Sequence, residues 1–194
     1  VRTESFFDGS ELGSHDRPAE ERERELLAPF PDAVTPEIMN RGWQAPQGDA
    51  GGQDRKNRAR AIAQLRDAGY EILNGVMTHV ETGHPLSFEI LVATPGEERL
   101  ALTYSRMVKR IGVIADVRNV DPSQYQERRS NYDFDTIFNS WFSSLSPGNE
   151  QSFYWGSAAA DMPGTRNYMG AKEPAIDAMI DGALAPRTRG RKKS

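Results

Sequence analysis

The chain has 194 residues, of which 37% are apolar and 27% are charged, and it contains no cysteine. This composition excludes disulfides and thiolate metal sites, and no apolar run approaches the roughly 18 residues of a membrane-spanning helix. The net charge is −4, but the last eight residues carry +5, which leaves −9 for residues 1–186. An acidic body argues against a nucleic-acid groove on the fold, and a short basic end is typical of a solvated tail.

The region before residue 86 predicts short, separate elements bounded by turn residues. An Asn-Gly pair at positions 74–75 is the strongest short signal for a type I′ hairpin turn. The expected elements are a loop (Val1–Pro18), a charged helix (Ala19–Ala28), one helical turn (Thr35–Met39), a loop with Trp43 as its large apolar anchor (Arg41–Gln53), a helix with Ala61, Ile62, Leu65 and Ala68 facing inward (Asp54–Ala68) and a hairpin (Tyr70–Met77).

Residues Leu86–Phe142 predict strand, helix, strand, helix, strand. The first strand, Leu86–Val92, ends in the nearly continuous apolar run of a strand covered on both faces. Thr94 and Glu97 form a capping box around Pro95, and Asp121 repeats this start signal for the second helix, which extends to about Asn131. In the first helix, one apolar stripe at helical spacing predicts the buried face and is made of Leu100, Tyr104, Met107, Val108 and Ile111.

Two crossovers of this length imply parallel strands with right-handed connections, with Val113–Val117 and Phe134–Phe138 as the second and third strands. The fold class is therefore α/β, a mainly parallel sheet flanked by helices. Ligands of such sheets bind beyond the carboxyl ends of the strands, which for the third strand is Asn139–Pro147. Downstream we expect helical turns (Asn149–Trp155), a loop (Ala158–Gly164), a last helix (Pro174–Leu184) and a disordered basic tail (186–194).

The ionisable and nucleophilic residues do not form a recognisable catalytic set. His15, His79 and His84 lack metal-ligand spacing, so no metal or cofactor is expected. Asp133 and Asp135 could point the same way, but hydrogen bonding at an element's end is the commoner role for such residues. The serines at 140–146 lack a Gly-x-Ser-x-Gly elbow, and no phosphate-binding glycine loop occurs.

Aromatic and small polar residues mix just after the third predicted strand, as they do in apolar pockets with a few hydrogen bonds. Two readings stay open for Trp141 and Trp155, because large aromatic residues are often simply core. Its place at the sheet's carboxyl edge favours a functional role for Trp141. The candidate ligand-binding residues are Trp141, Ser143, Ser144, Leu145, Asn149 and Tyr154.

Several motifs resemble those of the extracellular solute-binding proteins of family 5, the peptide-binding components of ABC importers. The resemblance covers about Thr3–Ala185. Its motifs include residues 65–70 (LRDAGY), 85–91 (PLSFEIL), 109–113 (KRIGV), 120–125 (VDPSQY) and 132–135 (YDFD). The Yej-type oligopeptide branch of the family is similar through residues 144–151 (SLSPGNEQ), 154–161 (YWGSAAAD) and 163–167 (PGTRN).

This resemblance implies a periplasmic binding protein-like lobe, with residues 1–185 as the second, C-terminal lobe of a two-lobed receptor. It implies a peptide ligand, membrane permease subunits and a first lobe of the same receptor as partners, and a monomer located in the periplasm. Dipeptide and oligopeptide binders hold the ligand's amino group with an aspartate three residues after this tryptophan. That position is Ser144 here, so the anchor is not carried over. The alternative is a free-standing doubly wound α/β enzyme with a site at 139–147.

Overall fold

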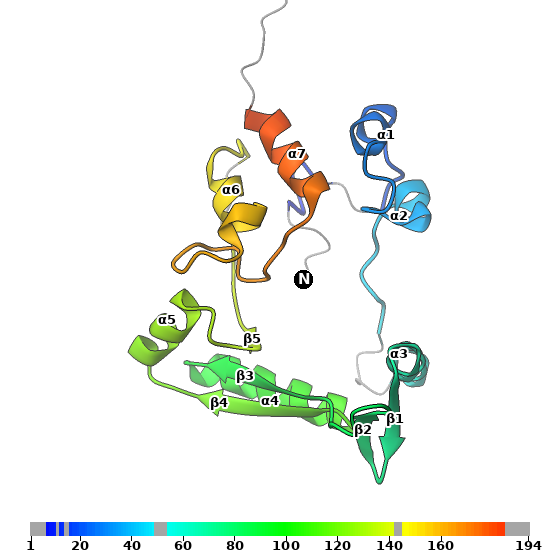
Figure 1. Cartoon of the computed structure of the whole chain (residues 1–194), viewed down its shortest axis with the longest axis vertical. Coiled ribbons are helices and arrows are strands. Elements are labelled where there is room, and N and C mark those ends of the chain that lie inside the picture. Colours follow the sequence, from blue (N-terminus) through cyan, green and yellow to red (C-terminus); the bar gives the residue numbers. More distant parts are fainter. Residues whose placement is uncertain (1–6, 11, 14–15, 49–53, 142–144, 185–194) are drawn as a thin grey trace, which may run out of the picture. The chain divides into compact units, whose positions relative to one another are not determined.

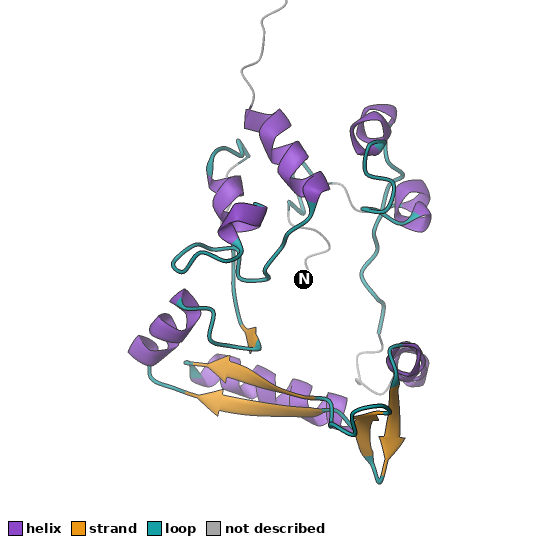
Figure 2. Ribbon diagram, in the orientation of Figure 1, coloured by secondary structure: helices purple, strands orange, loops and turns teal. Residues whose placement is uncertain are grey.

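The computed structural model describes residues 7–10, 12–13, 16–48, 54–141 and 145–184. The chain divides into two compact units, one formed by residues 1–45 and 141–194 and the other by residues 46–140. The second unit contains both helices and strands, whereas the regular elements in the described part of the first unit are helices (Figures 1 and 2).

The second unit is built on a parallel sheet, as the crossovers predicted. Its strands are β3 (Ser87–Val92), β4 (Ile114–Asn119) and β5 (Thr136–Ile137), in the order β4-β3-β5, with Ser87 opposite Ile114 and Ile90 opposite Thr136. The crossovers are α4 (Pro95–Lys109) and α5 (Pro122–Ser130). The third strand is shorter than the predicted Phe134–Phe138, because only Thr136 and Ile137 pair with β3. Asp135 accepts a hydrogen bond from the Glu89 backbone N–H at 2.8 Å.

The two crossover helices contact opposite faces of the sheet. Ile90 and Val92 pack with Ala101 of α4 and Ala115 of β4, in a core to which Phe88, Val108, Val117 and Phe138 are added. Glu89 alternates to the other face, where the Arg128 guanidinium of α5 lies 2.9 Å from its carboxylate. The Tyr125 hydroxyl of α5 donates to the Phe138 carbonyl at 2.9 Å. The α/β class predicted from the sequence is therefore confirmed.

Only part of the apolar stripe predicted for α4 is a packing face, since Val108 packs against the core and Ile111 is half-buried. Leu100, Tyr104 and Met107 are 62%, 49% and 44% exposed. The sheet instead takes the face that carries Ala101 and Ser105, because small side chains let the helix backbone approach closely. The Ser105 hydroxyl donates to the Ala115 carbonyl at 2.7 Å, which fixes this orientation.

Local capping chemistry sets the helix starts where the sequence predicted them. Thr94 and Glu97 form the expected capping box at α4, and the Asp121 carboxylate accepts from Ser123 and Gln124 at the start of α5. The hairpin joins β1 (Tyr70–Leu73) to β2 (Val76–His79), with positive φ at both Asn74 and Gly75. Helix α3 (Arg55–Asp67) precedes it and is capped by Asp54. Ala68, expected to face inward, is exposed because the helix ends before it.

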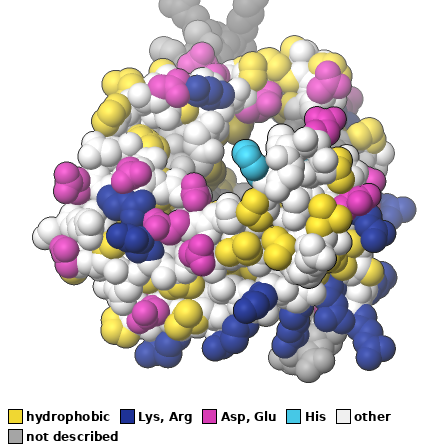
Figure 3. All heavy atoms as spheres, turned by 60° about the horizontal axis from the view of Figure 1, so that its bottom comes forward, with side chains coloured by type: hydrophobic (Ala, Val, Ile, Leu, Met, Phe, Trp, Pro, Cys, Tyr) yellow, Lys and Arg dark blue, Asp and Glu magenta, His cyan; other side chains and the backbone are white. Residues whose placement is uncertain are grey.

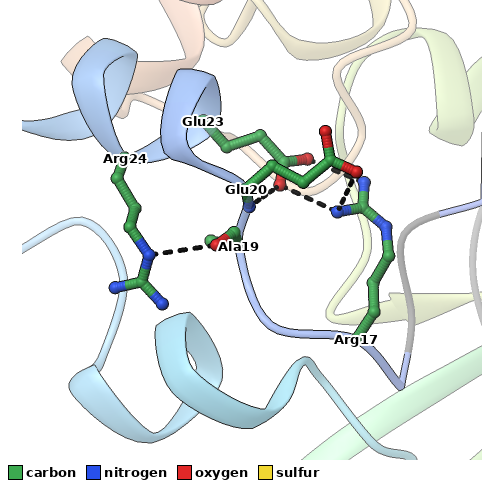
Figure 4. A network of polar contacts seen from close by, with 5 residues as sticks. All are labelled: Arg17, Ala19, Glu20, Glu23 and Arg24. Atoms are coloured by element: carbon green, nitrogen blue, oxygen red, sulfur yellow. Dashed lines mark hydrogen bonds and ion pairs between the residues drawn. The ribbon is translucent and has the colours of Figure 1, made fainter.

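The helices of the first unit are α1 (Glu21–Leu27), α2 (Pro36–Arg41), α6 (Glu150–Trp155) and α7 (Pro174–Leu184), with a short 3₁₀ helix η1 (Ser157–Ala159) where a plain loop was expected. Arg17 holds the start of α1 through a two-pronged pair with Glu23, each N–H···O distance being 2.9 Å (Figure 4). The Arg24 guanidinium joins Ala19 to the Met39 carbonyl of α2. Trp43 is 45% exposed and is not the anchor that its size predicted.

Gly112 joins the end of α4 to the hairpin. Its φ is +82°, and a Cβ built there would lie 2.6 Å from the Met77 backbone nitrogen. The Met77 N–H also donates to the Gly112 carbonyl at 2.8 Å, so the two backbones touch directly. A side chain at this position would have to separate them, because neither contact atom belongs to a flexible side chain.

We therefore expect Gly112→Ala to lower the free energy of unfolding by more than about 3 kcal/mol, through left-handed strain plus steric overlap. Gly83→Ala is the matched control, since Gly83 has φ +70° with no atom within 4 Å of its added Cβ. The control should cost only about 1 kcal/mol. Urea unfolding of both variants measures the difference, and equal losses would show that the close approach is unimportant.

Candidate functional site

Four aromatic rings gather in the first unit. Trp141 lies 4.5 Å from Tyr154, 5.8 Å from Trp155 and 5.7 Å from Tyr168, measured between ring centroids. The Tyr168 ring stacks on Trp141 with an interplanar angle of 16°. Helix α6 supplies Tyr154 and Trp155, and the segment before α7 supplies Tyr168. Tyr154 is buried, whereas Trp141, Trp155 and Tyr168 are half-buried.

Arg166 brings a cation to the edge of this aromatic cluster (Trp141, Tyr154, Trp155 and Tyr168). Its guanidinium donates to the Tyr154 hydroxyl at 3.3 Å and lies 5.8 Å from the centre of the Tyr154 ring. The Arg166 backbone N–H donates to the Phe153 carbonyl of α6. Arg166 remains exposed, so its charge is available to a carboxylate in solution.

The buried amide of Asn167 positions the segment that carries Arg166 and Tyr168. Asn167 has no exposed surface. Its Nδ2 donates to the Gly156 carbonyl at 3.0 Å and to the Ala171 carbonyl at 2.8 Å, while its Oδ1 accepts from the Ala171 N–H at 2.8 Å. Thr165 adds hydrogen bonds to the carbonyls of Ala159 and Met162. These hydrogen bonds hold residues 165–171 against residues 156–162, which directly follow α6.

An apolar groove of about 540 Å³ adjoins the cluster and shares Trp155 with it. Helix α7 contributes one wall, α6 and Pro147 another, and the α1–α2 segment a third. The lining side chains are Leu27, Ala33, Val34, Pro147, Gln151, Trp155, Glu173, Ala175, Ile176, Met179, Ile180 and Ala183. A groove of this size and composition suits an aliphatic or aromatic group, with Glu173 and Gln151 as its polar members.

Two carboxylates brace the helices around the groove. Hydrogen bonds from the Ser157 hydroxyl and backbone N–H lower the pKa of Asp177, whose Oδ1 lies 2.8 Å from the Ser157 nitrogen. Hydrogen bonding to the Gly148 backbone N–H is the main cause that lowers the pKa of Glu150. Both groups are therefore ionised at neutral pH, where each satisfies a backbone donor at the end of a helical element.

The structure brings together two of the six predicted ligand-binding residues, Trp141 and Tyr154. Leu145 is 58% exposed, and Asn149 is exposed at the start of α6, where its side chain forms no capping hydrogen bond. Ser143 and Ser144 lie outside the described residues. Sequence reasoning left Trp155 close to a core role and missed Tyr168 and Arg166, because both lie far along the chain from Trp141. Only the PGTRN motif at 163–167 pointed towards that segment.

The carboxylates considered as a catalytic pair have structural partners instead. The Asp133 carboxylate lies 2.9 Å from the Arg128 guanidinium, and Asp135 caps the Glu89 N–H. In the described part of the chain, no group of three or more His, Cys, Asp or Glu side chains could hold a metal ion. Among the same residues, no helix is both long and apolar enough to span a membrane.

Comparison with protein families matches residues 32–163 to the bacterial extracellular solute-binding proteins, family 5 (middle region). The chain belongs to this family. The family is one of solute-binding proteins and not of enzymes. The fold is also that of solute-binding proteins. A Brucella melitensis relative, provisionally named a binding protein, is 47% identical over 188 residues, which is 97% of this chain and 30% of the relative.

Two Agrobacterium fabrum relatives of this family 5 chain are each 41% identical. One is YejA, provisionally named a peptide-binding protein, matched over 92% of this chain and 29% of its own length. The other is the peptidoglycan-binding protein YepA, matched over 96% of this chain and 30% of its own length. The chain thus spans about 30% of the length of these relatives.

Solved structures of other proteins share the fold. The oligopeptide-binding protein AppA from Bacillus subtilis, in complex with a nonapeptide, has a TM-score of 0.56 at 20% identity, covering 84% of this chain and 33% of AppA. NikZ from Campylobacter jejuni, in complex with Ni(L-His), has a TM-score of 0.57 at 18% identity, covering 68% of this chain and 27% of NikZ. At these identities the likeness concerns the fold alone.

Asn167→Ala should lower the free energy of unfolding by about 2–3 kcal/mol, because it removes the Asn167 partner of the half-buried Ala171 N–H and carbonyl and one of the two hydrogen bonds to the Gly156 carbonyl, which also accepts from the Ala159 N–H. Asn149→Ala is the matched control, and it should change stability by less than about 0.5 kcal/mol, since its amide is exposed and caps nothing. Urea titration measures both values. Similar stabilities for the two variants would contradict the role given to the Asn167 amide.

Proposed function

We propose that this chain is one lobe of a receptor that binds peptides or peptide-like solutes for an ABC importer. Residues 1–185 would form the second, C-terminal lobe, and the basic tail at 186–194 would lie outside it. The partners would be a first lobe of the same receptor, a peptide ligand and the membrane permease subunits. The receptor would act as a monomer in the periplasm, without a cofactor.

The observation that carries the proposal is the half-exposed aromatic cluster with Arg166 at its edge. Aromatic faces bury apolar ligand surface at low entropic cost, because each side chain has only two rotatable bonds. Trp141 and Tyr168 offer such faces, and the Arg166 guanidinium suits a ligand carboxylate. A peptide combines these two chemistries, since it carries apolar side chains and a terminal carboxylate on one chain.

Each of the remaining candidate residues has a role in this proposal. The backbone of residues 143–145 and the hydroxyls of Ser143 and Ser144 would pair with an extended peptide backbone, as strand-like recognition requires. The side-chain amide of Asn149 would form a further hydrogen bond with the ligand, because it is exposed and makes no capping bond. The apolar groove beside Trp155 would accept one hydrophobic side chain of the ligand. Sequence-tolerant main-chain contacts of this kind suit a receptor for many peptides.

The relatives support this class of ligand. The Agrobacterium proteins at 41% identity are named for peptides and for peptidoglycan, a polymer that carries short peptides, and AppA holds a nonapeptide. NikZ holds a nickel–histidine complex, so the fold also serves small chelates. No specific observation favours the alternative of a free-standing enzyme, because Asp133 and Asp135 are engaged in structural hydrogen bonds.

In the full-length receptor, Trp141→Ala should weaken peptide affinity at least about tenfold, because it removes the central stacking face of the cluster. Trp43→Ala is the matched control, a 45% exposed tryptophan elsewhere in the same unit, and it should leave affinity within about twofold. Isothermal titration calorimetry with a short peptide measures both. Trp141→Phe should recover part of the loss.

Circular dichroism melts separate binding from folding in this experiment. Trp141 is half-buried, so its removal should cost some stability while leaving the receptor folded at the temperature of the titration. Unchanged affinity of a folded Trp141→Ala receptor, with a large fall in melting temperature, would assign Trp141 to the core alone and would contradict the proposed site.

A further inference from the structure

The apolar groove of the first unit is continuous with the aromatic cluster. Helices α6 and α7 contact each other, and α7 contributes Ile176 and Ile180 to the lining. Trp155 lines the groove, and its ring centroid also lies 5.8 Å from that of Trp141. A ligand that covers the cluster can therefore place one side chain in the groove. Because the walls are mainly apolar, they favour methylene or aromatic groups of that side chain.

Two polar side chains line the groove, and both offer oxygen acceptors. The Gln151 amide nitrogen donates to Glu150 Oε1 at 3.1 Å, so the amide oxygen remains for a ligand. Glu173 Oε1 accepts a long hydrogen bond from the Ala175 N–H, at 3.4 Å. Among the described residues, no cation forms an ion pair with Glu173 and no donor reaches its Oε2. The groove therefore lacks a donor that would match its two acceptors.

The segments that form the groove walls carry acidic residues and no basic ones. These segments are residues 27–34, 147–155 and 173–184, and none of them contains Lys or Arg. Their acidic residues are Asp32, Glu150, Glu173, Asp177 and Asp181. Glu173 is the one whose side chain lines the groove itself. No basic side chain of the walls would repel a cation in the groove, and the surrounding carboxylates attract one.

The shortage of cations at the groove is local. On the face of the molecule that Figure 3 shows, Lys and Arg side chains gather along the lower margin. The two cations nearest α7 in sequence before it have partners elsewhere. Lys172 Nζ lies 2.7 Å from Asp161 Oδ2, and the Arg166 guanidinium donates to the Tyr154 hydroxyl. A ligand can therefore supply the cation that the groove lacks.

We propose that the groove selects a ligand side chain with a long aliphatic stem that ends in a cation, as in lysine. This inference rests on the proposed peptide-binding function and names the side chain that this part of the site prefers. The methylene stem packs on Trp155, Ile176 and Ile180, as the stems of lysine and arginine do on apolar protein surfaces. The terminal ammonium donates to the Glu173 carboxylate and to the Gln151 amide oxygen.

The two acceptors distinguish this side chain from an apolar or an acidic one. An apolar side chain of the same length buries the same stem but removes water from Glu173 without replacing its hydrogen bonds. An acidic side chain brings a second carboxylate towards Glu173, and like charges at short distance repel. The expected order of preference is therefore basic, then apolar, then acidic.

Peptides that differ in one side chain test the proposal in the full-length receptor. Pentaalanine would carry lysine, norleucine or glutamate at each position in turn, where norleucine has the aliphatic stem of lysine without its charge. At one position or more, lysine should bind at least about threefold more tightly than norleucine, and glutamate more weakly than both. The lysine preference should shrink in about 1 M salt, because a partly exposed ion pair is screened. Isothermal titration calorimetry measures the affinities.

Glu173→Gln removes the charge and keeps an oxygen that can accept from the Ala175 N–H. This variant should bind lysine peptides at least about threefold more weakly than wild type, with an affinity close to that for norleucine peptides. Glu37→Gln is the matched control, because Glu37 is an exposed carboxylate in the first turn of α2 and does not line the groove. The control should keep the lysine preference of the wild type.

The possible outcomes separate this inference from the function on which it rests. Equal binding of lysine and norleucine peptides at every position would overturn the inference and leave the peptide-binding function standing. A lysine preference that survives Glu173→Gln would also overturn it, because the cation would then be bound at another site. Absence of binding by every one of these peptides would contradict the proposed function, and this inference with it.

Discussion

The arrangement of the candidate site depends on one buried amide. Asn167 has no exposed surface and forms three hydrogen bonds to backbone groups at Gly156 and Ala171. A buried amide that is fully paired stabilises a single loop conformation, because any other conformation leaves polar groups without partners. The loop held in this way carries Arg166 and Tyr168 to Tyr154 and Trp141. The aromatic cluster therefore depends on the hydrogen bonds of the Asn167 amide as much as on the burial of apolar surface.

Much of the fold could be predicted from the sequence because short-range chemistry sets it. Asp54, Thr94 and Asp121 each accept backbone hydrogen bonds at a helix start, within three residues of their own position. Asn74 and Gly75 adopt the positive φ angles that their turn requires. The lengths of the crossovers then imply parallel strands, because a hairpin cannot connect parallel neighbours. The order β4-β3-β5 was not predicted, because right-handed connections also allow the order β3-β4-β5.

Other features could not be predicted, because distant contacts decide them. Periodicity located the apolar stripe of α4, but packing chose the face with Ala101 and Ser105, where small side chains allow close approach to Ala115. The same competition left Leu100 and Tyr104 exposed to solvent. In the candidate site, Trp141 and Tyr154 could be predicted from their neighbours, whereas Tyr168 joins the cluster through bonds of Asn167 that no local pattern reveals. The family motifs identified the segments that form the candidate site but did not predict how their side chains are arranged.

Family membership and the half-exposed cluster together give an account in which the first unit supplies the ligand contacts and the parallel sheet supplies a scaffold. Photo-crosslinking tests this account most directly. A short peptide carrying a benzophenone side chain would be irradiated with the full-length receptor, with and without excess unlabelled peptide, and the adducts would be located by mass spectrometry. The account predicts competed adducts within residues 141–168. Competed adducts confined to residues outside 141–168 would contradict it.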